Sequence, residues 1–361
     1  MISMKNIIIS IALLLTISIV GCNSISDQFI DFNNENIEYM GRIGKTDSTA
    51  ELYWSGSSIK IEFEGTAVSA ILKDEKGKNY FNVIIDNDSI AILHLDSVKR
   101  TYQLAAELPK GKHTVQLFKR TEWTSGQTDF FGFEIEGSKV FSIPSKKRTI
   151  EFYGNSITCG YGVEDYAGDS PDSIYTNNYN SYAAVTARHF DANYYCTARS
   201  GIGITVSWFP MIMKEMYYRL NPADENSHWD FSKAPPDIVV INLFQNDSWL
   251  VNRPNNEQFK NRFGTKKPTK EFIINSYRKF VQEIRIQYPA SSIICMLGNM
   301  DITKEGSVWP TYVKGAVKQL NDKKIHTLFV PYKNTPGHPE VEEQKAMANS
   351  LIKYIEKNIK W

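Results

Sequence analysis

Ser156 is the residue of this 361-residue chain whose setting most clearly predicts chemistry. It lies in residues 153–159 (YGNSITC), directly after the apolar, β-like stretch 148–152. A strand that turns into a helix in this way presents a hydroxyl at the carboxyl edge of a sheet, where open α/β sheets bind their ligands. A serine hydroxyl becomes a nucleophile when a base removes its proton. Ser156 is therefore the candidate nucleophile, and a Gly-Asn-Ser that only forms a turn is the alternative.

His338 is the candidate base for this nucleophile. It lies in residues 336–339 (PGHP), ahead of a segment with an apolar helical face. Pro339 suits the first turn of a helix, which predicts His338 at the helix cap. The positive end of the helix dipole at that position favours a neutral imidazole. A capping histidine without a chemical role is the alternative.

Two further residues could stabilise an oxyanion. Asn246 follows the apolar run 238–243, and its side-chain amide could donate to a developing negative charge. Gly201, in the run 199–203 (RSGIG), could offer a backbone N–H to the same oxygen. Both residue types are also common in plain turns, which is the alternative for each.

The elements that must position these residues alternate along the second half of the chain. Apolar runs at 150–153, 194–198, 238–243, 293–297 and 326–330 predict strands, and the patterns at 181–189, 269–287, 310–321 and 340–359 predict helices. Strands separated by helices predict a three-layer α/β/α domain with a five-stranded parallel sheet. We assign this domain to residues 146–361.

The first half predicts a different fold. From residue 38 to residue 140, short alternating strands are separated by turn signals such as 86–89 (DNDS) and 109–111 (PKG). Such spacing predicts a β-sandwich. We assign it to residues 37–145, preceded by a polar tether at 23–36.

Residues 1–22 predict an export signal rather than a folded element. Lys5 precedes an apolar run from residue 7 to residue 20, which is too short to span a bilayer and ends in Gly21-Cys22. The run 19–22 resembles a bacterial lipoprotein signal, which implies lipidation of Cys22 and a membrane-anchored protein in the periplasm or at the cell surface. A plain signal peptide with an incidental cysteine is the alternative.

The composition argues against nucleic-acid binding and metal binding, but it does not decide whether the cysteines form a disulfide. The net charge of +1, without a long basic stretch, gives no electrostatic support for nucleic-acid binding. Cys159, Cys196 and Cys295 have no metal-site spacing, so we expect no metal. We expect buried free thiols, with a Cys159–Cys196 bridge as the alternative.

Serine, glycine, asparagine and histidine in this order resemble the SGNH (GDSL-like) hydrolase superfamily. The resemblance implies Ser156 as nucleophile, His338 as base, and Gly201 and Asn246 with the Ser156 amide as the oxyanion hole. Residues 154–162 (GNSITCGYG) further resemble carbohydrate esterase family 2, as does a jelly-roll-like sandwich ahead of the hydrolase domain. Three sandwich motifs are similar to that family: 54–57 (WSGS), 63–66 (FEGT) and 119–122 (KRTE).

The chain departs from the superfamily pattern at three places. The usual Gly-Asp-Ser is Gly-Asn-Ser, and Phe244 replaces a glycine two residues before Asn246, which we expect to reshape the pocket floor. Thr335 stands where an aspartate usually precedes the histidine. Threonine has no charge to stabilise an imidazolium, so an active enzyme needs a substitute, such as a backbone carbonyl at Nδ1 of His338. The alternative, which the resemblance to the family also allows, is a serine–histidine dyad. The acidic loop 164–172 is expected to be solvated, with a cleft-lining role as the alternative.

The resemblance implies a carbohydrate O-acetylesterase that acts on plant cell-wall polysaccharide of xylan or mannan type, without a cofactor. Trp249, three residues after Asn246, is a candidate for stacking on a sugar ring, with core packing as the alternative. Two other functions stay open. One is a glycan-binding protein with a degenerate hydrolase domain, and the other is an esterase for another acetylated substrate.

Overall fold

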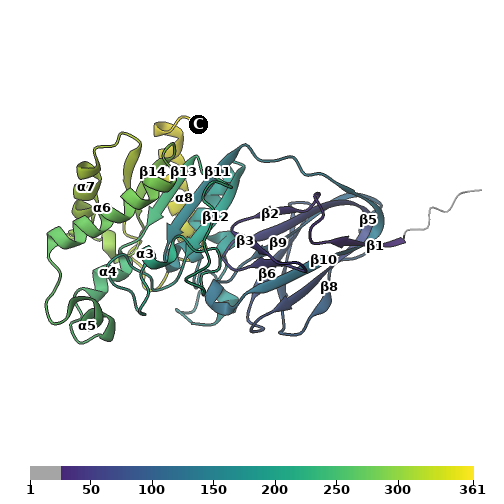
Figure 1. Cartoon of the computed structure of the whole chain (residues 1–361), viewed down its shortest axis with the longest axis horizontal. Coiled ribbons are helices and arrows are strands. Elements are labelled where there is room, and N and C mark those ends of the chain that lie inside the picture. Colours follow the sequence, from purple (N-terminus) through teal and green to yellow (C-terminus); the bar gives the residue numbers. More distant parts are fainter. Residues whose placement is uncertain (1–25) are drawn as a thin grey trace, which may run out of the picture.

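Two β-sheets, one antiparallel and one parallel, organise the chain in the computed structural model, which describes residues 26–361 (Figure 1). The antiparallel sheet comes first in the sequence, and the parallel sheet with its helices follows. This is the predicted order of a β domain and an α/β domain. The export signal and Cys22 lie outside the described residues.

Ten strands pair into the antiparallel sheet. Their bounds are β1 Ser26–Asp31, β2 Glu38–Met40, β3 Ile43–Lys45, β4 Ala50–Leu52, β5 Ser58–Asp74, β6 Tyr80–Ile85, β7 Ser89–His94, β8 Arg100–Ala105, β9 Gly111–Lys119 and β10 Thr128–Phe141. The long strands β5 and β10 pair along most of their length, and each also pairs with shorter strands. Alternate residues of β5, such as Ile59, Ile61 and Phe63, are buried in one apolar cluster, as the alternation predicts.

The predicted tether at 23–36 is wrong where β1 lies. Residues 26–31 (SDQFID) pair with residues 132–137 of β10, so the sheet begins before residue 37. Phe29 and Ile30 occupy neighbouring positions of the strand, yet Phe29 is exposed while Ile30 is buried. With one buried apolar side chain in a short polar segment, the alternation is too weak to reveal the strand from sequence.

The parallel sheet has five strands in the order β12-β11-β13-β14-β15. Their bounds are β11 Arg148–Gly154, β12 Ala192–Ala198, β13 Ile238–Asn242, β14 Ser292–Leu297 and β15 Ile325–Phe329. All four pairings are parallel, and all five strands coincide with the predicted apolar runs. The predicted five-stranded parallel sheet is confirmed.

Helices cover both faces of this sheet (Figure 1). Their bounds are α1 Ser156–Cys159, α2 Tyr182–His189, α3 Met213–Met216, α4 Gln245–Leu250, α5 Glu257–Phe263, α6 Lys270–Gln287, α7 Trp309–Leu320 and α8 Val341–Asn358. Helices α2 and α8 pack on one face and α6 and α7 on the other, so alternate strand residues enter different cores. The four predicted helices end within one residue of the expected positions. The short helices α1, α3, α4 and α5 were not resolved by periodicity. No helix among residues 26–361 combines the length and apolar character needed to cross a membrane.

Residues of both domains pack into the same apolar clusters, and one buried ion pair joins the two domains. Tyr53 and Trp54 of the sandwich domain belong to the α6/α7 core, and Phe118 belongs to the α2/α8 core. Arg42 lies 2.7 Å from Glu151 on β11, with both side chains almost fully buried. Arg42 also donates to two backbone carbonyls of the hydrolase domain, at 2.6 and 2.9 Å. A charged pair with these extra partners fixes the orientation of the two domains.

Replacing Arg42 by Met should destabilise the protein by about 3–5 kcal/mol, because Glu151 would keep a buried charge without a partner. The free energy of unfolding in urea, followed by tryptophan fluorescence, measures the loss. The double variant Arg42→Met/Glu151→Leu should recover part of it, because no unpaired charge remains. A single variant within about 1 kcal/mol of the parent would contradict this role of the pair.

Candidate active site

Ser156 lies on a tight turn between β11 and α1. The side chain of Asn155 accepts from the Ile157 amide at 3.1 Å and so caps the short helix. A Cβ atom at Gly154 would lie 1.9 Å from Oγ1 of Thr158, so only glycine permits the close approach of strand and helix. Ser156 takes the first helical position, with 6% of its surface exposed.

The register of the sheet brings the predicted site segments to one edge. Gly154 is level with Ala198 on one side and with Asn242 on the other. The loops that carry Gly201 and Asn246 therefore start beside the turn that carries Ser156. The Arg199 amide also donates to the Gly154 carbonyl at 3.3 Å.

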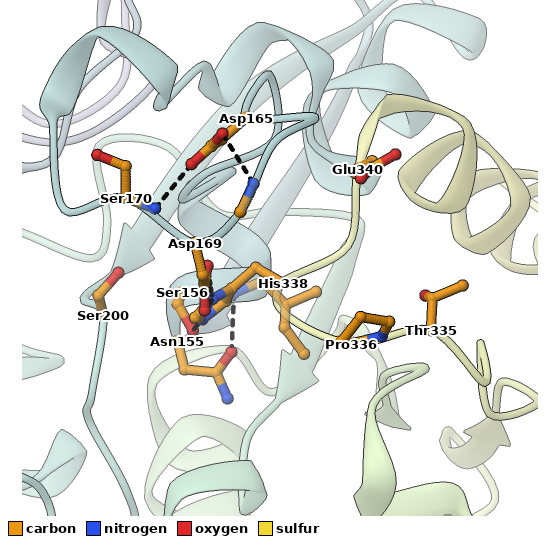
Figure 2. Close-up of polar contacts among 12 residues, drawn as sticks. Asn155, Ser156, Asp165, Asp169, Ser170, Ser200, Thr335, Pro336, His338 and Glu340 are labelled. Atoms are coloured by element: carbon orange, nitrogen blue, oxygen red, sulfur yellow. Dashed lines mark hydrogen bonds and ion pairs between the residues drawn. The ribbon is translucent and has the colours of Figure 1, made fainter.

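His338 contacts the predicted nucleophile. Its Nε2 atom lies 2.9 Å from Oγ of Ser156, although 182 residues separate them (Figure 2). The predicted helix-cap position is wrong, because α8 begins at Val341 and its N-cap is Glu340. The imidazole therefore does not lie at the helix cap, and a carboxylate contacts it instead.

Asp169 is the partner of the far nitrogen of His338. Its Oδ1 and Oδ2 atoms lie 2.7 and 3.0 Å from Nδ1 (Figure 2). An ionised carboxylate can only accept, so Nδ1 carries the proton and Nε2 is free to accept from Ser156. The hydrogen bond from His338 lowers the pKa of Asp169, which keeps this carboxyl ionised at neutral pH. The expected backbone carbonyl at Nδ1 is therefore wrong, and so is the expectation that loop 164–172 is merely solvated.

Thr335 takes no part in this contact. Its hydroxyl binds Lys333 and Glu343, and Figure 2 shows it apart from His338. Thr335, at the position that an aspartate usually occupies, therefore makes only local contacts with Lys333 and Glu343. Asp169 was missed because it lies in a loop without periodicity, 169 residues from His338. The available signal was the cluster of acidic residues shortly after the nucleophile.

Asp165 shapes the loop that carries Asp169. Its carboxylate is buried and accepts the backbone amides of Ala167 and Gly168 at 3.2 Å and of Ser170 at 2.7 Å. Figure 2 shows the chain bending around Asp165 with Asp169 turned toward His338. Three charge-assisted hydrogen bonds of this kind hold a loop that has no helix or strand of its own.

Two backbone amides are available for an oxyanion. Within residues 26–361, neither the Ser156 nor the Gly201 N–H donates to another protein group. Gly201 has φ +82°, in the left-handed region that glycine adopts without strain. Unpaired N–H groups at the carboxyl edge of a sheet can receive a developing negative charge.

The side-chain amide of Asn246 has a fixed orientation. Its Nδ2 donates to the Ile202 carbonyl at 2.8 Å, and its Oδ1 accepts from Nε1 of Trp208 at 3.0 Å. Because an indole N–H only donates and a carbonyl only accepts, the amide cannot be flipped. One N–H of Asn246 remains for an oxyanion. Nothing in the sequence indicated this contact between Trp208 and Asn246.

Asp247 braces the loop beside Asn246. It is fully buried and accepts from the amides of Ile204, Thr205 and Val206 and from the Thr205 hydroxyl. Burial raises the pKa of Asp247 despite these bonds, since desolvation outweighs them. The contacts tie the loop after β12 to the start of α4, and thus Gly201 to Asn246.

The comparison with known proteins identifies the family. Residues 39–144 match the family model "Carbohydrate esterase 2 N-terminal". "Cellulase/esterase CelE" from Acetivibrio thermocellus is 32% identical over 352 residues, which make up 92% of this chain and 40% of that protein. The chain thus spans less than half of that relative. An "Acetylxylan esterase / glucomannan deacetylase" from Cellvibrio japonicus is 24% identical over 346 residues, covering 93% of this chain and 92% of the relative.

A solved structure of a family two carbohydrate esterase from Clostridium thermocellum, in complex with cellohexaose, decides the assignment. It is 30% identical to this chain with a TM-score of 0.77, and the match covers 89% of this chain and 98% of that one. The chain belongs to carbohydrate esterase family 2. A family two esterase from Cellvibrio japonicus shares the fold, with a TM-score of 0.82 at 22% identity and coverage of 92% and 98%. The resemblance expected from the motifs is confirmed.

Phe244, at the position of a glycine in the superfamily pattern, keeps the backbone shape of a glycine. Its φ is +83°, in the left-handed region. Its ring is buried against Tyr277 at 4.7 Å and Trp309 at 4.9 Å between centroids. The side chain therefore fills the core under α6 and α7. The expected reshaping of the pocket floor receives no support from this placement.

Trp249 lies one helical turn beyond Asn246. Its Nε1 donates to Asp301 at 2.7 Å, and Asp301 also accepts from Gln245 at 2.6 Å. Trp249 lines a groove of about 340 Å³ together with Lys304 and Trp309. The groove includes none of the four predicted site residues, so a sugar-binding role of Trp249 stays a prediction.

Within residues 26–361, the cysteines form no disulfide, and no cluster of potential metal ligands is found. Cys159, Cys196 and Cys295 are free and buried, as expected. Burial raises the pKa of each thiol, to about 12 for Cys196 and Cys295. Residues 26–361 contain no group of three or more histidine, cysteine or carboxylate side chains arranged to hold a metal ion.

Asp169→Asn should lower kcat for p-nitrophenyl acetate by about 10²-fold or more, toward the ~10⁴ of a buried triad aspartate. The neutral amide stabilises the protonated imidazole less, so the acidic limb of the pH–rate profile should move to lower pH. In the parent protein the lowered pKa of Asp169 keeps its carboxylate present at neutral pH, and its contribution is lost only as pH falls through that lowered value.

Thr335→Ala is the control for this variant, because it alters the usual aspartate position without touching His338. It should keep the kcat and the pH profile of the parent. If Asp169→Asn behaved like Thr335→Ala, the carboxylate would have no catalytic role.

Proposed function

We propose that this chain is a carbohydrate O-acetylesterase that works through an acyl-enzyme. The observation that carries the proposal is the continuous hydrogen-bond chain from Ser156 through His338 to Asp169. A nucleophile, a base in the correct tautomer and a charged group behind it are the three parts that serine esterases require. Family membership supports a carboxylic ester as substrate.

In the first step, Oγ of Ser156 attacks the acetyl carbonyl, and its proton moves to Nε2 of His338. The resulting imidazolium is stabilised by Asp169 at Nδ1, without transfer of that proton. His338 then donates the Nε2 proton to the departing sugar oxygen as the carbon–oxygen bond breaks. The products of this step are a free sugar hydroxyl and acetyl-Ser156.

Three donors are proposed to receive the negative charge on the carbonyl oxygen. They are the amides of Ser156 and Gly201 and the free N–H of Asn246, which Trp208 orients. One such donor typically contributes about 10²–10³ in rate. In the second step, Nε2 of His338 takes a proton from water, and the hydroxide oxygen attacks the acetyl carbonyl. His338 then returns that proton to Oγ of Ser156 as the bond between Oγ and the acetyl carbon breaks, which releases acetate and restores the serine hydroxyl.

The proposed substrate is acetylated plant cell-wall polysaccharide of xylan or mannan type. The names of two relatives, "Acetylxylan esterase / glucomannan deacetylase", support this substrate class. A glycan chain in contact with the site fits the bound cellohexaose in the solved relative. We further propose that Trp249 stacks on a sugar ring in the groove that it lines.

Two of the three departures that favoured a glycan-binding protein with a degenerate hydrolase domain are accounted for. The first is the aspartate missing at Thr335, because the carboxylate of Asp169 lies at the same nitrogen. The missing glycine at Phe244 is also accounted for, because the left-handed backbone is retained. No observation in the structure favours binding without catalysis.

Ser156→Ala should abolish acetate release from acetylated xylan and glucomannan while leaving the fold intact, because the variant lacks the attacking oxygen. Acetate release by an enzyme-coupled assay and the thermal unfolding midpoint are the two measurements. Ser232→Ala, on an exposed turn, is the matched control and should keep full activity. Acetate release by Ser156→Ala at the parental rate would refute the mechanism.

We also propose that Cys22 is lipidated and anchors the exported protein to a membrane. The sequence of residues 1–22 supports this proposal. Cys22→Ser should move the protein from the membrane fraction to the soluble fraction, because acyl chains on Cys22 provide the anchor. Labelling with a palmitate analogue tests the lipid directly, and a Cys22→Ser protein that still carries label would contradict the assignment.

A further inference from the structure

We propose that the sandwich segment Lys119–Glu122 positions two opposite parts of the active site, Arg120 through the loop of Asp169 and Glu122 through the loop of Gly201. The inference rests on the function proposed above and adds two positioning residues from the other domain. Neither side chain contacts Ser156 or His338 through a hydrogen bond. Each acts through a loop that Asp165 or Asp247 anchors within the hydrolase domain, and adds to it a contact from the other domain.

The loop of Asp169 has little structure of its own. Between α1 and α2 it contains only two 3-10 turns, η2 (Ser173–Tyr175) and η3 (Asn178–Asn180). Val163 of this loop is buried, but Tyr166, three residues before Asp169, is 68% exposed. Close to Asp169, polar contacts are therefore the main anchors of the proposed catalytic carboxylate.

Arg120 supplies contacts to three places in this loop. Its buried guanidinium binds Glu164 at 2.5 Å, the Ile174 carbonyl at 2.9 Å and the Thr176 carbonyl at 3.4 Å. Its own carbonyl accepts from the Asn178 amide at 3.0 Å. A planar guanidinium can join several acceptors at fixed angles, which suits it to tie one loop at several points.

Glu164 extends this contact along the loop. Its other oxygen accepts from the side chains of Asn177 and Asn180 at 2.6 and 2.9 Å. Glu164 precedes Asp165, whose carboxylate holds the turn that ends at Asp169. Arg120 is thus connected to Asp169 in three steps. It binds Glu164, Glu164 is adjacent to Asp165, and Asp165 binds the turn that carries Asp169.

Glu122 holds the other side of the site. Its buried carboxylate accepts the Ser200 amide at 2.8 Å and also binds the Ser200 hydroxyl. Ser200 is labelled in Figure 2, across the nucleophile from Thr335, and it directly precedes Gly201. Arg199, on the other side of Ser200, packs its guanidinium 4.8 Å from the ring centre of Trp123 and 3.2 Å from that of Phe209. Residues 122 and 123 thus fix the chain just before the amide that we assign to the oxyanion.

The segment itself is firmly attached to the sandwich domain. Lys119 is buried and donates to Asn79 at 2.7 Å and to the carbonyls of Thr121 and Glu122 at 3.3 and 3.2 Å. The Lys119 carbonyl accepts from the Gly56 amide at 2.9 Å. Because these contacts fix Lys119–Glu122 to the sandwich domain, the segment can hold both loops in place.

The two positioning residues should give different kinetic signatures. Disturbing the Arg120 contact displaces Asp169, so it should lower kcat and also move the acidic limb of the pH–rate profile. Disturbing the Glu122 contact displaces only an N–H donor, so it should lower kcat without moving that limb or KM. A residue that merely supports the fold would produce neither pattern.

The test uses isosteric variants of the full chain, Glu164→Gln and Glu122→Gln, measured with p-nitrophenyl acetate. Glu62→Gln, which removes the ion pair with Lys112 on the sandwich surface, is the matched control and should leave all parameters unchanged. Each loop variant should lower kcat roughly tenfold, since small misplacements near a reacting centre cost up to 10²-fold. Arg120→Lys replaces Glu164→Gln if that variant does not fold by circular dichroism, and Ser200→Ala likewise replaces Glu122→Gln.

Double variants that combine Asp169→Asn with Glu164→Gln or with Glu122→Gln distinguish the effect of Arg120 from that of Glu122. Glu164→Gln should have no further effect in that background, because the carboxylate it positions is gone, whereas the loss from Glu122→Gln should persist in full. Loop variants with parental kcat and pH profile, or a Glu164→Gln loss that persists without the Asp169 carboxylate, would overturn the inference. If Asp169→Asn alone had no effect, the proposed triad and the Arg120 route would fail together, and Glu122→Gln would still test the other route.

Discussion

The hydrogen bond between Asp169 and His338 is the contact on which the site depends. It joins an irregular loop to the segment before the last helix, and it determines which imidazole nitrogen faces Ser156. The Asp169 side chain is 43% exposed, so water competes for its oxygens. Such a contact holds its geometry only if the loop is fixed elsewhere. The buried bonds of Asp165 and Arg120 hold this loop, and in the proposed mechanism they let the first domain support the site.

The two domains are separate in topology but not in packing. They share apolar clusters on both faces of the parallel sheet, and the buried Arg42–Glu151 pair crosses between them. At Gly56 a Cβ atom would lie 2.3 Å from the Tyr194 ring, so the two surfaces meet without spare room. Close packing of this kind limits relative movement of the two domains, which favours a defined geometry in the loops that both domains contact.

Sequence reasoning predicted what depends on local periodicity or on chain order. The apolar runs predicted the five parallel strands, and the helical patterns that begin at residues 181 and 269 predicted α2 and α6. The structure shows that the hydroxyls of Ser181 and Thr269 cap these two helices. Parallel register then required the segments after β11, β12 and β13 to meet at one edge. Asp169 could not be predicted in this way, because its position is set by Asp165 and by a residue from another domain. β1 was missed for a related reason: its pairing with β10 is long-range, and its own pattern is polar.

The departures from the superfamily pattern illustrate what a motif constrains. In the proposed mechanism a negative charge at Nδ1 of His338 stabilises the imidazolium. Asp169 reaches this nitrogen from another segment, so the threonine at position 335 does not leave it without a carboxylate. At Phe244 the constraint is the left-handed backbone that turns β13 into α4. A non-glycine residue there costs about 1–2 kcal/mol. Burying the Phe244 ring against Tyr277 and Trp309 contributes a similar or larger amount, so the fold tolerates the strain. In both cases different residues meet the same physical requirement, so a comparison of motif residues alone would not have predicted the contacts that the structure shows.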